Sequence, residues 1–118
     1  MTTLLRVAAA ACFVTLAALS LLPAKAITRT EFGGLAEHMI AYLGTALVTG
    51  MAFRNKPTLG TQGAFLILYA AVLEILQYFA PGRTPAIADF VASGAGVALG
   101  SACLWLARGR VARWLRLD

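Results

Sequence analysis

The chain has 118 residues, of which 60% are hydrophobic and 13% are charged, and its formal net charge is +5. Soluble domains carry about 25% charged residues, so this composition excludes an ordinary soluble domain and indicates a membrane protein. The length suits one small helical bundle, and we therefore expect a single membrane domain over residues 1–118.

Four apolar runs follow one another along the chain, each close to the roughly 20 residues that a helix needs to cross a bilayer. They predict transmembrane helices near residues 4–22, 35–53, 64–80 and 85–107, followed by a basic interfacial tail at 108–118. Because the connections are short, we expect an all-α membrane protein with the four helices in an up-down-up-down bundle.

The first run has two interpretations. Arg6 gives a basic start, an apolar stretch follows, and Ala24-Lys25-Ala26 resembles a signal-peptidase cleavage site. The apolar stretch is long for a signal peptide, where about 7–15 residues are usual. On these residues alone, a signal peptide over residues 1–26 and a retained helix are equally supported.

The connections set the remaining helix boundaries. Residues 54–63 are rich in turn-forming residues, so the third helix is expected to begin near Ala64. Thr84 and Pro85 are typical of an N-cap followed by the first helical residue, which places the start of the fourth helix near Pro85.

The basic residues are distributed unequally between the two sides of the predicted bundle. One side holds seven: Arg6, Arg54, Lys56, Arg108, Arg110, Arg113 and Arg116. The other holds three: Lys25, Arg29 and Arg83. The positive-inside rule therefore predicts that both termini are cytoplasmic. The arginines of the tail adjoin a span, which favours contact with anionic membrane lipids and argues against nucleic acid as a partner.

The predicted fourth helix carries a row of small residues. Ala92, Gly96 and Gly100 recur every four positions, and such rows let helix backbones approach closely in lipid. The row could form a dimer face or pack within the bundle. We favour packing within the bundle, because three neighbouring helices are available.

Polar residues interrupt the third and fourth apolar runs. Glu74 lies near mid-span in the third, with Gln77 one turn later on the same face. Asp89 lies about one turn into the fourth helix, and Arg83 lies in the turn between them. A charge at mid-bilayer costs about 2.5–3.5 kcal/mol on insertion scales, so Glu74 requires a partner or a function.

Glu37 and His38 near the start of the second helix belong to the same side of the predicted bundle. If these helices pack together, we expect the six polar residues to converge on one outward-facing pocket. A structural network that fixes helix packing and a ligand site are both consistent with this pattern.

An enzymatic role finds little support in the sequence. One His with three carboxylates is a possible divalent-cation set, but no HExxH, CxxC or paired-His spacing is present, and there is no serine elbow or phosphate-binding loop. We therefore expect no catalytic residues, no metal and no cofactor.

Two stretches carry a resemblance to a known family. They are "EHMIAY", Glu37–Tyr42, and "LEILQYFAPGRTPAIADFVASGAGVALG", Leu73–Gly100. The chain resembles the VanZ-like family of small bacterial membrane proteins at His38, Glu74, Gln77, Arg83, Asp89, Gly96 and Gly100. It departs at Ser93, where members often have Asn, and near Glu37, where they have Asp or Lys.

The resemblance implies a four-helix protein of the bacterial inner membrane, with the first helix retained. The namesake of the family is associated with low-level resistance to the glycopeptide teicoplanin. We expect an envelope protein whose polar pocket binds an anionic lipid or lipid-linked headgroup and affects glycopeptide or envelope-stress sensitivity. The alternatives are a scaffold or assembly partner of another membrane protein, and an intramembrane lipid-phosphate enzyme.

Overall fold

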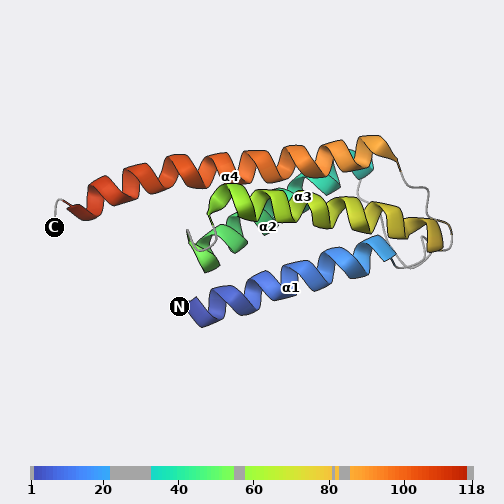
Figure 1. Cartoon of the computed structure of the whole chain (residues 1–118), viewed down its shortest axis with the longest axis horizontal. Coiled ribbons are helices and arrows are strands. Elements are labelled where there is room, and N and C mark those ends of the chain that lie inside the picture. Colours follow the sequence, from blue (N-terminus) through green and yellow to red (C-terminus); the bar gives the residue numbers. More distant parts are fainter. Residues whose placement is uncertain (1, 22–32, 55–57, 81, 83–85, 117–118) are drawn as a thin grey trace.

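The computed structural model describes residues 2–21, 33–54, 58–80, 82 and 86–116, and within these ranges every regular element is a helix (Figure 1). The elements are α1 (Thr2–Leu21), α2 (Gly33–Phe53), α3 (Leu59–Leu76), the short 3₁₀ helix η2 (Gln77–Phe79) and α4 (Ile87–Arg116). Consecutive α-helices run in opposite directions, so α2 and α4 are parallel (Figure 1). The predicted all-α bundle of four helices is confirmed.

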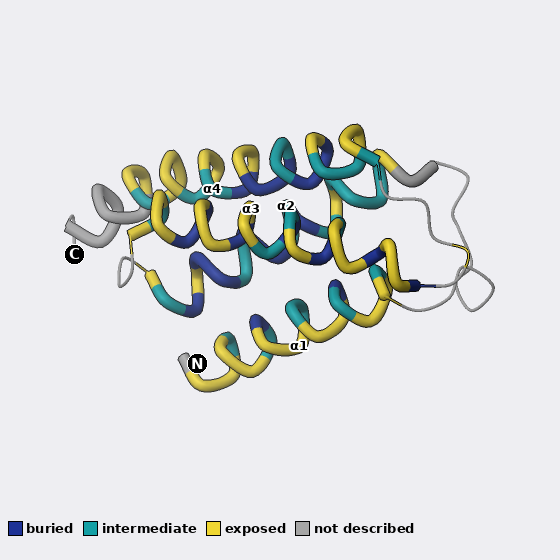
Figure 2. Tube along the Cα trace, turned by 45° about the vertical axis from the view of Figure 1, so that its right-hand side comes forward, coloured by how far each residue is buried: buried dark blue, intermediate teal, exposed yellow. Residues whose placement is uncertain are grey.

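Three helical stretches are long and apolar enough to cross a membrane, namely Thr3–Leu21, Leu59–Phe79 and Ile87–Arg110. Large apolar side chains on these helices point outward, including Val14, Leu68 and Trp105. This arrangement is typical of a bundle whose outer surface contacts lipid tails. Figure 2 shows it most clearly for α1, which is largely exposed.

Helix α2 has the predicted length, at 21 residues, but among the described residues it is not one of these three stretches. It carries Glu37 and His38 near its start and the buried Thr45 and Thr49 further along. It packs most extensively on α4 and also contacts α1 and α3. Most of α2 is buried or half-buried against the other helices, although Leu35, Ile40 and Met51 are exposed, so its polar residues do not have to face lipid.

The small residues of α4 lie against α2. A Cβ on Gly96 would overlap the carbonyl oxygen of Met39, and a Cβ on Gly100 would lie 2.8 Å from the carbonyl oxygen of Leu43. Ala92, one turn before Gly96, is buried. The row Ala92, Gly96 and Gly100 therefore allows close approach of the α2 and α4 backbones inside the bundle, which is the arrangement favoured from the sequence.

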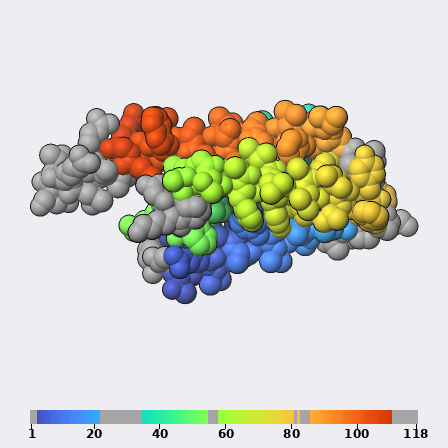
Figure 3. All heavy atoms as spheres, viewed as in Figure 1, coloured from blue at the N-terminus to red at the C-terminus, as the bar shows by residue number. Residues whose placement is uncertain are grey.

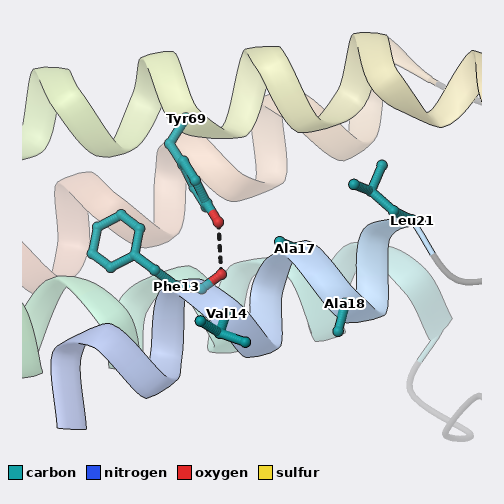
Figure 4. A pocket seen from close by; sticks show the side chains of 6 residues that line it. All are labelled: Phe13, Val14, Ala17, Ala18, Leu21 and Tyr69. Carbon is teal, nitrogen blue, oxygen red and sulfur yellow. Dashed lines mark hydrogen bonds between the residues drawn. The ribbon is translucent and has the colours of Figure 1, made fainter. Parts of the chain in front are cut away.

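Helix α1 is attached to α3 by an aromatic contact. The Tyr69 hydroxyl donates a 2.6 Å hydrogen bond to the Phe13 carbonyl oxygen, and the two rings meet edge to face at 4.8 Å between centroids (Figure 4). An open apolar cavity of about 470 Å³ adjoins this contact. Its lining consists of Phe13, Val14, Ala17, Ala18, Leu21 and Tyr69. Among the described residues, no carboxylate, His, Lys or Arg lines the cavity.

At the end of the bundle where α2 terminates, side chains of α3 and α4 bond to backbone carbonyl oxygens. The Gly50 carbonyl oxygen also accepts from the Arg54 N–H at 2.9 Å. Arg54 takes a left-handed conformation (φ 52°) directly after α2. Arg108 donates from Nη2 to the Gly50 carbonyl oxygen at 2.6 Å, and Gln62 donates from Nε2 to the Arg54 carbonyl oxygen at 2.9 Å. A guanidinium at the C-terminal end of a helix is also favoured by the helix dipole.

Two helix boundaries differ from the sequence prediction. Helix α3 begins at Leu59 rather than near Ala64, because the Thr58 side chain caps it by accepting from the Thr61 N–H at 3.3 Å. Helix α4 continues to Arg116 rather than ending near 107, and its C-terminal part extends beyond the other helices (Figure 1). In the space-filling view, α4 runs along one edge of the molecule (Figure 3). Basic residues do not interrupt a helix, so the predicted separate tail is part of α4. Thr84 and Pro85 lie outside the described residues.

We predict that Gly96→Val lowers the thermal unfolding midpoint in mild detergent, by an amount equivalent to about 1–3 kcal/mol, because the new side chain forces the α2 and α4 backbones apart. Gly94→Val is the matched control. It adds the same β-branched side chain to the same helix, yet a Cβ on Gly94 has no neighbour within 4 Å. Equal midpoints for the two variants would contradict this packing.

Candidate functional site

Three ionisable side chains from three helices meet at one end of the bundle. They are His38 near the start of α2, Glu74 near the end of α3 and Asp89 in the first turn of α4. One nitrogen of His38 and one carboxylate oxygen of each acid all lie within 4.8 Å of one another. All three residues are half-buried. We refer to His38, Glu74 and Asp89 as the polar triad.

Helix packing explains why His38 and Asp89 meet. Gly96 lies against Met39 and Leu43, which fixes the register between the parallel helices α4 and α2. Two turns before Gly96, α4 reaches Asp89, and this stretch lies beside the beginning of α2, where His38 is found. Helix α3 ends at the same end of the bundle and brings Glu74 to it (Figure 1).

Glu74 caps the fourth helix from outside it. Its Oε1 accepts a 2.8 Å hydrogen bond from the backbone N–H of Ala86. The Ala86 carbonyl oxygen accepts from the N–H groups of Asp89 and Phe90 at 3.1 and 3.4 Å, so Ala86 is the residue that precedes the first turn of α4. A carboxylate at this position also interacts favourably with the positive end of the helix dipole.

The cap leaves Asp89 available for the triad. Asp89 occupies the third helical position, where an acidic side chain often reaches back to the N–H of the capping residue. In this chain that N–H belongs to Ala86 and is bound by Glu74 instead. Glu74 can cap α4 in place of Asp89 because α3 and α4 meet at this end of the bundle.

Buried polar residues surround the triad along the same helices. Tyr42, one turn after His38, is buried and close enough to Glu74 for electrostatic interaction. Ser93 is buried and donates its hydroxyl to the Asp89 carbonyl oxygen at 3.0 Å, so it is bonded within its own helix. Gln77 is buried in η2, one turn after Glu74.

Two residues of the predicted pocket remain, Glu37 and Arg83. Glu37 is half-buried on α2 beside His38 but is not part of the triad. Arg83 lies outside the described residues. The Ala86 N–H at the start of α4 is bound by Glu74. Sequence reasoning missed Ala86 because a backbone donor has no residue-type signature.

The fold and the triad define a helical-bundle membrane protein with a half-buried polar site at one end. Within this class, the family described as VanZ/LLP1 matches residues 4–108, and the chain belongs to this VanZ-like family. The match covers the triad and the glycines that pack α4 on α2. Comparisons with curated proteins and with solved structures gave no significant match.

We predict that Glu74→Ala lowers the free energy of unfolding by about 1–3 kcal/mol, because the Ala86 N–H loses its acceptor at a partly buried helix end. Glu74→Gln retains a side-chain oxygen in the same place and should preserve most of the stability. Thermal unfolding of both variants in the same detergent measures the difference. A Gln variant as unstable as the Ala variant would show that the cap does not stabilise the bundle.

Proposed function

We propose that this VanZ-family protein acts in the bacterial cell envelope by binding the headgroup of an anionic lipid or lipid-linked precursor at the polar triad. The observation that carries the proposal is the meeting of His38, Glu74 and Asp89, half-buried, at one end of the bundle. Holding ionisable groups in a membrane domain is costly, so they are usually associated with a ligand, an ion or proton transfer.

The charge distribution supports a non-cytoplasmic position for the triad. Arg6, Arg54, Arg108 and Arg110 belong to the opposite end of the bundle. Arg6 lies 5.2 Å from the centre of the Phe53 ring, and Arg108 reaches the Gly50 carbonyl oxygen, so both are at the end where α2 terminates. Under the positive-inside rule, this distribution supports cytoplasmic termini and a position of the triad at the outer surface of the inner membrane.

The electrostatics of the triad restrict how an anion can bind. Two carboxylates face one imidazole, and Glu74 already accepts from the N–H at the start of α4. A phosphate group therefore requires additional positive charge at this end. Arg83, in the connection between η2 and α4, is one source from the sequence, and a bound cation is another.

Binding of a headgroup at the outer surface connects the site to antibiotic sensitivity. Glycopeptides act on envelope precursors outside the inner membrane, and a protein that binds a lipid-linked headgroup there competes for or redistributes the same molecules. We therefore propose that loss of the triad alters glycopeptide or envelope-stress sensitivity.

A structural role is the second candidate, and the bond between Glu74 and Ala86 favours it. This bond joins α3 to α4 across a short connection, as expected of a polar lock in a scaffold or assembly partner. The two candidates differ in what they require of Asp89. A lock needs Glu74, whereas headgroup binding needs the whole triad.

We predict that Asp89→Asn purifies with several-fold less anionic lipid than the wild type, at equal protein abundance and equal thermal stability. The substitution preserves the shape of the side chain and leaves the Glu74–Ala86 bond in place. Mass spectrometry of lipids in the purified protein measures the effect, and glycopeptide sensitivity of the expressing cells is the second readout. Asp118→Asn, which removes the same group from the last residue of the chain, is the control.

An unchanged lipid content and unchanged glycopeptide sensitivity in Asp89→Asn would reject headgroup binding and leave the structural role. A loss of stability in Glu74→Ala with wild-type behaviour of Asp89→Asn is the pattern expected of the lock alone.

A further inference from the structure

We propose that the polar triad binds a divalent transition-metal cation, with ligands from the His38 imidazole and from the Glu74 and Asp89 carboxylates. The proposal deepens the function above, and its second part, in which the ion bridges to a headgroup phosphate, rests on that function. Metal binding itself does not depend on it.

The distances suit a single ion. Three atoms that all lie within 4.8 Å of one another have a common point no more than about 2.8 Å from each. Metal–ligand bonds of about 2.0–2.2 Å to imidazole nitrogen and carboxylate oxygen are reached from there by small rotations of the side chains. The three ligands come from three helices, so their arrangement is set by the packing of the whole bundle.

The donor types indicate which ions fit. One imidazole and two carboxylates are nitrogen and oxygen donors of the kinds that divalent first-row metals accept, whereas Mg²⁺ and Ca²⁺ prefer oxygen alone. Three protein ligands leave coordination positions open. The site is therefore selective for ions such as Mn²⁺, Co²⁺ or Zn²⁺ and retains room for an oxygen from another molecule.

Neighbouring groups hold the ligands as outer-shell partners do in metal sites. The Ala86 N–H fixes Glu74 at 2.8 Å, and the same bond frees Asp89 from the capping role of its helix position. A divalent ion has the charge to pair with two carboxylates, and in this position it would contact both together with the imidazole.

The ion also explains how an acidic site can bind an anion. The two carboxylates neutralise a divalent cation, and an open coordination position then accepts a phosphate oxygen. The phosphate does not have to approach the bare carboxylates. Headgroup binding at the triad is consequently metal-dependent in this scheme.

Metal binding is tested on the full-length protein purified in detergent, stripped with a chelator and titrated with Co²⁺, Zn²⁺ or Mn²⁺ in the absence of added lipid. We expect one ion per chain by calorimetry and a visible Co²⁺ spectrum typical of nitrogen and oxygen ligands, without thiolate bands from Cys12 or Cys103. Mg²⁺ and Ca²⁺ at the same concentration should not displace the bound ion.

Variants identify the ligands. Asp89→Asn and Glu74→Gln should each weaken Co²⁺ binding at least tenfold while retaining the wild-type thermal midpoint, and His38→Ala should change the Co²⁺ spectrum. Asp118→Asn should bind as the wild type does. Glu74→Gln preserves the cap, so loss of metal in this variant reports ligation rather than folding.

The metal proposal is overturned if the stripped protein binds no transition metal, or if all three triad variants bind it like the wild type. These outcomes are separable from failure of headgroup binding. If the wild type binds metal at the triad but has the same lipid content as Asp89→Asn, the metal site is supported and headgroup binding is rejected. If the lipid content depends on Asp89 but not on metal, headgroup binding is supported and the bridging metal is rejected.

Discussion

The fold depends on satisfying the backbone groups at helix ends, where the chain leaves N–H and C=O groups without helical partners. In a membrane an unpaired group of this kind is costly, because lipid tails offer no hydrogen bonds. The bundle meets this constraint with one contact between helices at each end. Glu74 of α3 accepts from Ala86 at the start of α4, and Gln62 of α3 donates to the Arg54 carbonyl oxygen directly after α2. Glu74 and Arg108 also place their charges where the helix dipoles favour them.

The first of these contacts connects stability to function. Because Glu74 takes the capping position from outside α4, Asp89 is not needed for it and joins His38. The same contact that closes the bundle therefore leaves a second carboxylate beside an imidazole. Gly96 contributes by allowing α4 to approach Met39, so that the first turn of α4 lies beside His38. Both the structural and the ligand-binding interpretation of this polar cluster therefore require Glu74, but only ligand binding requires Asp89.

Much of the fold could be predicted from hydrophobic run lengths, because a span needs about 20 apolar residues and four such runs are present. The boundaries of α3 and α4 could not, since Thr58 caps a turn-rich segment and α4 continues through a basic sequence. The meeting of His38, Glu74 and Asp89 followed from the alternating direction of the helices. The sequence could not show that the three side chains lie close enough to bind one ion, because this depends on the register that Gly96 sets between α2 and α4. The partner of Glu74 was also hidden, since Ala86 acts through its backbone.

The meeting of the start of α2 with the start of α4 at the triad can be measured by chemical cross-linking in native membranes. In a background with Cys12→Ala and Cys103→Ala, His38→Cys is combined with Asp89→Cys and treated with a short bifunctional thiol reagent. We expect a cross-linked peptide pair by mass spectrometry, and none when His38→Cys is combined with Trp105→Cys towards the other end of α4. Cross-linking of both pairs to the same extent, or of neither, would show that the two helix starts do not meet in this way.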